Sequence, residues 1–105
     1  MYLGLDFGTS SVKGVLIDDA QGVLAEASAP LAVSRPHEGW SEQSPADWIA
    51  ATEQVMDQLA AEGLGAVRGI GLSGQMLAAL ILDKDLRPLR PAMLWNDQRA
   101  LAECA

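Results

Sequence analysis

The segment LGLDFGTSSVKGVLID, residues 3–18, constrains the fold of this chain more than any other stretch. Large apolar residues alternate with small or polar ones before Gly8, and the chain is again mostly apolar from residue 12 to residue 17. Such alternation, with a period of two, is typical of half-buried strands. The segment therefore predicts two strands, 3–7 and 12–17, joined by a tight turn at residues 8–11.

The turn itself consists of small residues, several of which carry hydroxyl groups. Gly8, Thr9 and Ser10 offer unobstructed backbone N–H groups, and a concave set of such donors suits phosphate oxygens. Asp6 precedes the turn, and a carboxylate beside phosphates requires a cation between them, which argues for Mg²⁺ held through water. Lys13 adds a point charge for the phosphates. These residues predict a phosphate site with magnesium at Asp6.

The residues alone leave a simpler interpretation open, an ordinary β-hairpin that ends in an exposed aspartate, because short turn patterns recur by chance. Neither GxxxxGK[ST] nor a GxGxxG that opens a helix is present. His37 is the only histidine and lies in a proline-rich loop, where we expect it to face solvent. Cys104 is the only cysteine, so no internal disulfide is possible and we expect a helix-face thiol without function.

The middle of the chain predicts a third strand, a helix and a fourth strand. Residues 23–29 are compatible with a strand that pairs back onto the second one. Ser44, which is followed by proline, indicates a helix start, and Gly63 or Gly65 indicates its end. Residues 67–73 predict a strand that, after a helix, is most economically parallel to the first. The outcome is an α/β unit, βββαβ, with a mixed sheet.

Further features concern packing around this unit. The helix should pack on the sheet through one apolar stripe: Trp48, Ile49, Thr52, Val55, Met56 and Leu59. Residues 41–43 should mainly hold their loop against the hairpin. Short strands are expected at 79–83 and 92–95, and a helix at 98–105 begins at the end of the chain without a stop signal. We therefore expect a truncated piece of a larger protein.

The composition limits the partners that the chain can have. A length of 105 residues suits one modest domain, and the net charge of −7 disfavours nucleic acid and anionic membranes, which require a basic face. The longest apolar run, residues 76–82, is far shorter than the roughly 20 residues of a membrane span. No signal-peptide pattern opens the chain, so we expect a cytoplasmic protein. The oligomeric state stays open.

Four ordered motifs resemble one protein family. Asp-x-Gly-Thr-Ser, followed by a second strand that ends in Asp, resembles the first phosphate motif of the actin, hexokinase and heat-shock ATPase superfamily. Residues 39–45 (GWSEQSP), 71–76 (GLSGQM) and 90–99 (RPAMLWNDQR) narrow the resemblance to the FGGY carbohydrate kinases, most of all to their xylulokinase branch. The resemblance implies a ribonuclease H-like, actin-like ATPase fold. Residues 1–105 would then be the N-terminal part of the first lobe, a single incomplete domain.

The resemblance also implies a function for the complete protein. It would transfer the γ-phosphoryl group of MgATP to a hydroxyl of a ketose such as D-xylulose. Asp6 would have a catalytic role by holding the magnesium, and the turn would lie against the transferring phosphate. The residues that line the sugar would be Gln75, Met76, Leu77, Trp95, Asn96 and Asp97. Since the catalytic base of the family lies beyond position 105, we expect this piece alone to be inactive.

One departure from the family pattern concerns Leu77. Xylulokinases usually carry a histidine followed by glycine at this point, whereas this chain has Leu77 and Ala78. Leucine would leave a sugar hydroxyl unpaired at a cost of about 1–3 kcal/mol, which puts xylulose itself in question. The alternatives are another ketose or polyol, a drifted paralogue, or a non-catalytic interaction module with an actin-like fold.

Overall fold

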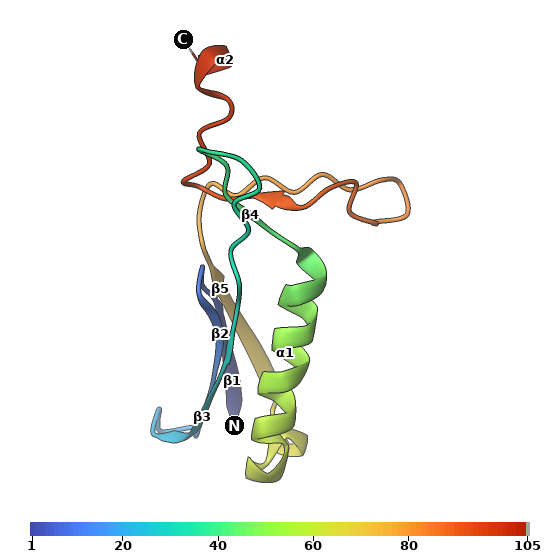
Figure 1. Cartoon of the computed structure of the whole chain (residues 1–105). Helices are drawn as coiled ribbons and strands as arrows, with labels where there is room; N and C mark the ends of the chain where they lie inside the picture. The colour runs from blue at the N-terminus through green and yellow to red at the C-terminus, as the bar shows by residue number, and fades with distance from the viewer. Residues whose placement is uncertain (105) are drawn as a thin grey trace.

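The computed structural model describes residues 1–104, and it places one helix along one face of a four-stranded sheet (Figure 1). A two-residue ladder lies beyond the end of this sheet. The strands are β1 (Tyr2–Phe7), β2 (Ser11–Ile17), β3 (Val23–Pro30), β4 (Glu42–Gln43), β5 (Gly69–Gly74) and β6 (Ala92–Met93). The helices are α1 (Pro45–Leu59), the 3₁₀ turns η1 (Ala60–Glu62) and η2 (Leu64–Ala66), and α2 (Leu101–Cys104).

The main sheet has the strand order β3-β2-β1-β5. β1 pairs antiparallel with β2, which in turn pairs antiparallel with β3, so the first three strands form a meander. β5 pairs parallel with β1 and places Ser73 beside Asp6. The predicted βββαβ unit with a mixed sheet is therefore confirmed. The smaller ladder joins β4 to β6.

Helix α1 covers β2 and β3 through Ala51, Val55 and Leu59, which are all buried. Glycine is required beneath it, because a Cβ atom at Gly14 would lie 2.5 Å from Cγ1 of Val55. The predicted stripe is wrong at Ile49, which is 63% exposed. At about 100° per residue, Ile49 lies roughly 160° around the helix from Ala51, and the small alanine occupies the inward position instead.

The ends of α1 follow the prediction with one difference. Ser44 is the N-cap residue in an extended conformation, but its side chain makes no capping hydrogen bond. After Leu59 the chain tightens into the 3₁₀ turn η1 and then reaches Gly63, whose φ of 104° is left-handed. Glycine adopts this conformation without a steric penalty, so Gly63 ends the helical segment as predicted.

The predictions for the last third of the chain were less accurate. Residues 79–83 form no strand but only isolated bridges, and the strand expected at 92–95 is limited to Ala92–Met93. Its partner β4 was not predicted. The final helix begins at Leu101 rather than at residue 98, and the backbone N–H of Arg99 donates to the Asp97 carboxylate before it. Ala105, the predicted helix end, lies outside the described residues.

Three smaller expectations can be compared with residues 1–104. His37 is exposed and packs edge-on against Trp40, with ring centroids 4.4 Å apart. Cys104 is a free and exposed thiol, as predicted. Trp48 and Met56 are only partly buried, and they pack against the core from its margin. In this part of the chain, no helix has the length and apolar character needed to cross a membrane.

Candidate functional site

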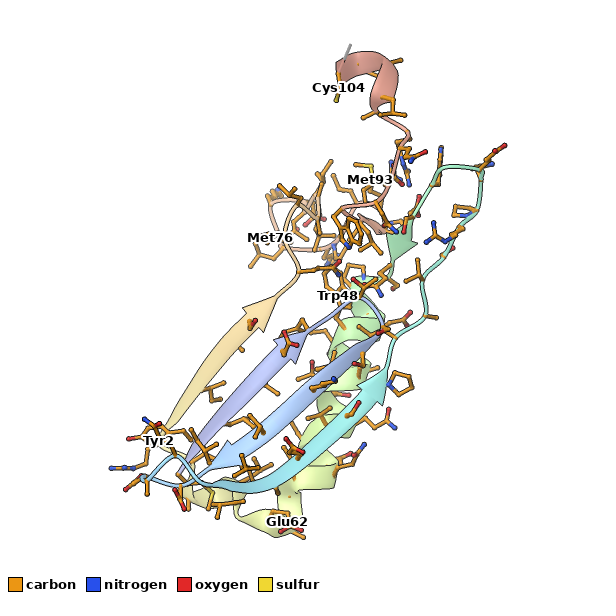
Figure 2. All side chains as sticks on the ribbon, turned by 90° about the vertical axis from the view of Figure 1, so that its left-hand side faces the viewer. Tyr2, Trp48, Glu62, Met76, Met93 and Cys104 are labelled. Carbon is orange, nitrogen blue, oxygen red and sulfur yellow. The ribbon has the colours of Figure 1, made fainter. Side chains whose placement is uncertain are left out.

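The face of the sheet opposite α1 is open, and it carries the predicted charged residues. Figure 2 looks onto this face, with α1 behind the sheet. Asp6 on β1 lies directly across from Lys13 on β2, and both side chains are exposed. A shallow cavity of about 840 Å³ extends over this face between Asp6, Lys13, Ser28 and Ser73. Gly4 and Gly71, which are neighbours in register, form part of its lining.

Asp6 has a side chain that suits a water-mediated magnesium site. Within residues 1–104 its carboxylate forms no hydrogen bond or ion pair, not even with Lys13 across the ladder. In the same part of the chain, no group of three or more His, Cys, Asp or Glu residues is arranged to hold a metal ion. A single free carboxylate fits Mg²⁺, which binds through one or two carboxylates and keeps several waters.

The turn between β1 and β2 presents some of the predicted donors but not all of them. The Gly8 N–H donates to the Ser11 carbonyl at 2.9 Å and is therefore used within the turn. The N–H groups of Thr9 and Ser10 donate to no backbone acceptor among the described residues. The Ser10 carbonyl accepts from Leu31 N at 2.9 Å, which fixes the back of the turn. Among the residues of the turn predicted to bind phosphate, Thr9 and Ser10 thus retain N–H groups without a backbone partner.

A network of neutral hydrogen bonds connects this turn to the chain beyond β5. The Gln43 Nε2 donates to the Thr9 carbonyl at 2.5 Å. The Thr9 hydroxyl donates to Gln75 Oε1 at 3.2 Å, and Gln75 Nε2 donates to Gln43 Oε1 at 3.3 Å. Gln43 is 1% exposed. The prediction that residues 41–43 hold their loop against the hairpin is confirmed for Gln43.

The predicted sugar-side residues lie at the same end of the sheet. Figure 2 shows Met76 and Met93 beyond the ends of β1 and β5, at the opposite end from Tyr2. The Trp95 Nε1 atom donates to the Thr9 hydroxyl at 3.5 Å, so the segments after β5 and β6 both reach the turn. Met76 and Leu77 are 79% and 86% exposed. Leu77 has a φ of 57°, an uncommon conformation for a bulky residue.

Asp97 behaves differently from the other predicted sugar-side residues. Its carboxylate accepts hydrogen bonds from Ser41 N at 2.7 Å, from Arg99 N at 3.0 Å and from the Arg99 guanidinium. The hydrogen bonds from the Arg99 side chain hold the pKa of Asp97 far below its ordinary value of 3.8, although burial opposes this shift. Asp97 therefore remains charged and bound to its own chain.

Arg99 connects Asp97 to Glu42 on β4. Its guanidinium donates to Glu42 at 2.7 Å, and Arg90 donates to the same Glu42 oxygen at 3.1 Å. It also stacks on Trp40, with 3.7 Å between the guanidinium carbon and the ring centroid. Hydrogen bonding to Asp97 raises the pKa of Arg99 above its ordinary range. We define the charged cluster as Trp40, Glu42, Arg90, Asp97 and Arg99.

In the chain, Asn96 lies between Trp95 and Asp97. Its Oδ1 atom is buried and has no hydrogen-bond partner among the described residues. A buried acceptor without a partner costs free energy unless water or a ligand binds to it. Because this oxygen has almost no exposed surface, it is not accessible to a ligand in this conformation.

Comparison with known proteins decides the family. The sequence profile of the N-terminal domain of the FGGY family of carbohydrate kinases matches residues 1–105. The chain belongs to this family. A xylulose kinase from Klebsiella pneumoniae is 50% identical to this FGGY chain over 99% of its length and 22% of the relative. A xylulose kinase from Escherichia coli is 47% identical, again over 99% of this chain and 22% of the relative.

Solved structures of family members confirm the predicted fold class. The crystal structure of a "xyloylose kinase" from Brucella ovis matches with a TM-score of 0.95 and 53% identity, over 97% of this chain and 22% of that one. A xylulose kinase from Rhodospirillum rubrum matches with a TM-score of 0.88 and 34% identity, over 98% of this chain and 22% of that one. The FGGY chain thus spans 22% of the length of these relatives.

Sequence reasoning did not single out Arg99, although it lies within the quoted motif of residues 90–99. Glu42 and Gln43 were considered as residues that could reach a sugar hydroxyl, but they were expected mainly to hold their loop against the hairpin. The sequence does not reveal that residues 42 and 99 meet in space.

Proposed function

We propose that residues 1–105 form the N-terminal part of the first lobe of an FGGY sugar kinase, a single incomplete domain. The complete protein transfers the γ-phosphoryl group of MgATP to a hydroxyl of a ketose such as D-xylulose. The observation that carries the proposal is the free carboxylate of Asp6 beside a turn whose Thr9 and Ser10 N–H groups have no backbone partner. The names of the relatives at 47–50% identity support the substrate class. A cytoplasmic location, where ATP is available, is part of this proposal.

The residues of the turn have distinct roles in this proposal. Asp6 holds the magnesium of MgATP through water, and Thr9 and Ser10 donate N–H groups to the phosphate oxygens. Gly8 gives the turn its shape, because a Cβ atom there would lie 3.2 Å from the Ser11 carbonyl oxygen. Lys13 contributes positive charge from the neighbouring strand. Bound magnesium supplies charge neutralisation for the phosphoryl group that is transferred.

The sugar side comprises the segments that follow β5 and β6. The wall of the sugar site is formed by Gln75, Met76, Leu77, Trp95 and Asn96. For Asp97 we propose an indirect role, because its carboxylate already accepts hydrogen bonds from Ser41 and Arg99. It holds the backbone that carries Trp95 and Asn96. The catalytic base is expected outside this chain, so these 105 residues alone have no kinase activity.

The test of this proposal is a coupled assay of ADP release with the full-length protein, Mg²⁺ and a panel of ketoses and polyols that includes D-xylulose. We expect turnover with one ketose. The Asp6→Ala variant should lose about 10³-fold or more in kcat, because the metal no longer has its ligand. The control Asp57→Ala changes an exposed acid on α1 and should retain full activity.

Two results would contradict the proposal. Retained activity in Asp6→Ala would remove the role of this residue. Absence of turnover with every sugar, together with absence of MgATP binding, would favour a non-catalytic module with the same fold. The preferred sugar of the panel also tests Leu77, since a Leu77→His variant should shift the preference toward D-xylulose if this side chain contacts the substrate.

A further inference from the structure

Gln43 is a buried polar residue at the junction of three elements. Its carboxamide makes three hydrogen bonds: Nε2 donates to the Thr9 carbonyl, while Oε1 accepts from Trp48 Nε1 at 3.0 Å and from Gln75 Nε2. These partners belong to the turn after β1, to α1 and to the segment after β5. No other side chain among the described residues bonds to all three of these elements.

The orientation of this carboxamide follows from its partners. An indole N–H is only a donor and a backbone carbonyl is only an acceptor. Rotation of the amide by 180° would place the NH₂ group against Trp48 and the oxygen against the Thr9 carbonyl, which is unfavourable at both ends. Trp48 therefore fixes the direction in which Gln43 holds the turn.

The contacts around Thr9 form a closed ring. Gln43 binds its carbonyl, Gln75 accepts from its hydroxyl, and Gln43 and Gln75 bind each other. Trp95 joins the ring through the same hydroxyl. The two N–H donors proposed for phosphate and the segments proposed for sugar are thus fixed to one another. A displacement of Gln43 would move both sides of the site.

We propose that Gln43 is a positioning residue that sets the phosphate turn relative to the sugar-side segments. This inference rests on the proposed function. Gln43 touches neither substrate and acts through Thr9 and Gln75. Misplacement of reacting groups by about 1 Å can cost about 10²-fold in rate, so a change at Gln43 should be visible in kinetics.

The test uses the same exchange at two positions of the full-length protein. Gln43→Glu retains an acceptor for Trp48 and Gln75 but turns a carboxylate oxygen toward the Thr9 carbonyl, which repels the turn. Gln54→Glu is the matched control, because it makes the same change of charge at an exposed position of α1 away from the turn. For each folded variant, kcat, the KM values of MgATP and sugar, and the Kd of MgADP are measured.

We expect Gln43→Glu to lower kcat by about 10- to 100-fold and to raise both KM values and the Kd of MgADP. Gln54→Glu should leave both KM values close to those of the wild type. A merely structural role of Gln43 would reduce the amount of folded enzyme and leave the KM values of the remaining fraction unchanged. That result would overturn the inference.

A milder variant covers the case in which Gln43→Glu does not fold. Trp48→Phe retains the packed ring but removes the N–H that fixes the carboxamide, and should raise the KM of MgATP by about 2- to 10-fold, equivalent to one hydrogen bond. Unchanged KM values in this variant would overturn the inference while the wild type remains active. A wild type without turnover and without MgADP binding would overturn the proposed function and the role of Gln43 with it.

Discussion

The body of the molecule and the layer beyond its strand ends are stabilised in different ways. In the body, α1 packs on the sheet through aliphatic side chains, and the buried cluster there contains leucine, valine and alanine only. In the strand-end layer, by contrast, three of the buried residues are Ser41, Glu42 and Gln43. The body is thus held by apolar burial, and the layer that carries the candidate site is held by directed hydrogen bonds.

The strand-end layer is itself divided by β4. Successive residues of a strand point to opposite sides. Gln43 therefore binds the neutral ring around Thr9, while Glu42 binds the arginines of the charged cluster. The neutral side contacts the candidate site, and the charged side anchors the segment that carries Trp95 and Asn96. A two-residue strand can thus support two networks with different electrostatic properties.

The largest effect on stability is expected in the body. Leu59→Ala removes a side chain that is 1% exposed beneath the end of α1, and should lower the free energy of unfolding by about 2–5 kcal/mol. Urea unfolding of the 105-residue chain, followed by circular dichroism, measures the change. Ile49→Ala on the same helix is the control, and a loss there as large as that of Leu59→Ala would contradict the observed packing.

The contribution of the charged cluster to stability should depend on pH in the acid range. Because the pKa of Asp97 is lowered, its contribution to stability is complete above its ordinary pKa of 3.8 and is lost as pH falls toward its folded value. Asp97→Asn should therefore be less stable than the wild type at about pH 5, and the difference should shrink toward about pH 2. Urea unfolding across this range measures it. A difference that is independent of pH would contradict the role of the charge.

Asp19 provides a matched control for this experiment. Its pKa is also lowered, chiefly by hydrogen bonds from the N-terminal amine and Arg68, but its side chain is 68% exposed. Salt screens exposed charges much more strongly than buried ones. High salt should therefore remove the effect of Asp19→Asn and leave most of the effect of Asp97→Asn.

The smallest effect is expected at the start of α1. A serine N-cap that binds the helix usually contributes about 0.5–2 kcal/mol. The Ser44 side chain makes no such bond, so Ser44→Ala should change the free energy of unfolding by less than about 0.5 kcal/mol. Asp47→Asn, which removes a charge from the first turn, should cost about 0.3–1 kcal/mol. A larger loss in Ser44→Ala than in Asp47→Asn would contradict this view of the helix start.

The body could be predicted from the sequence because its signals are local. Alternation over residues 3–7 and 12–17 sets the period of the strands, and Gly63 marks the end of the helical segment. The error at Ile49 has the same origin, since a hydrophobic pattern does not show that alanine faces inward. The prediction of a phosphate site at Asp6, Gly8 and Thr9 also rests on local spacing, and it stays a prediction.

The strand-end layer could be predicted only in part, because its partners are far apart in the chain. Glu42 and Arg99 are separated by 57 residues, and Thr9 and Trp95 by 86. No periodicity connects such pairs, and short elements such as β4 depend on them. For this reason the prediction of a strand at residues 79–83 was wrong, and β4 was not predicted.

The parallel pairing of β1 with β5 has a consequence during synthesis on the ribosome. β1 ends at Phe7 and β5 ends at Gly74, so about 67 residues must be added before this edge of β1 acquires its partner. At translation rates of about 5–20 residues per second, the edge remains unpaired for roughly 3–13 seconds. Unpaired strand edges can pair with other chains. Slow translation of this region should therefore increase aggregation of the nascent protein.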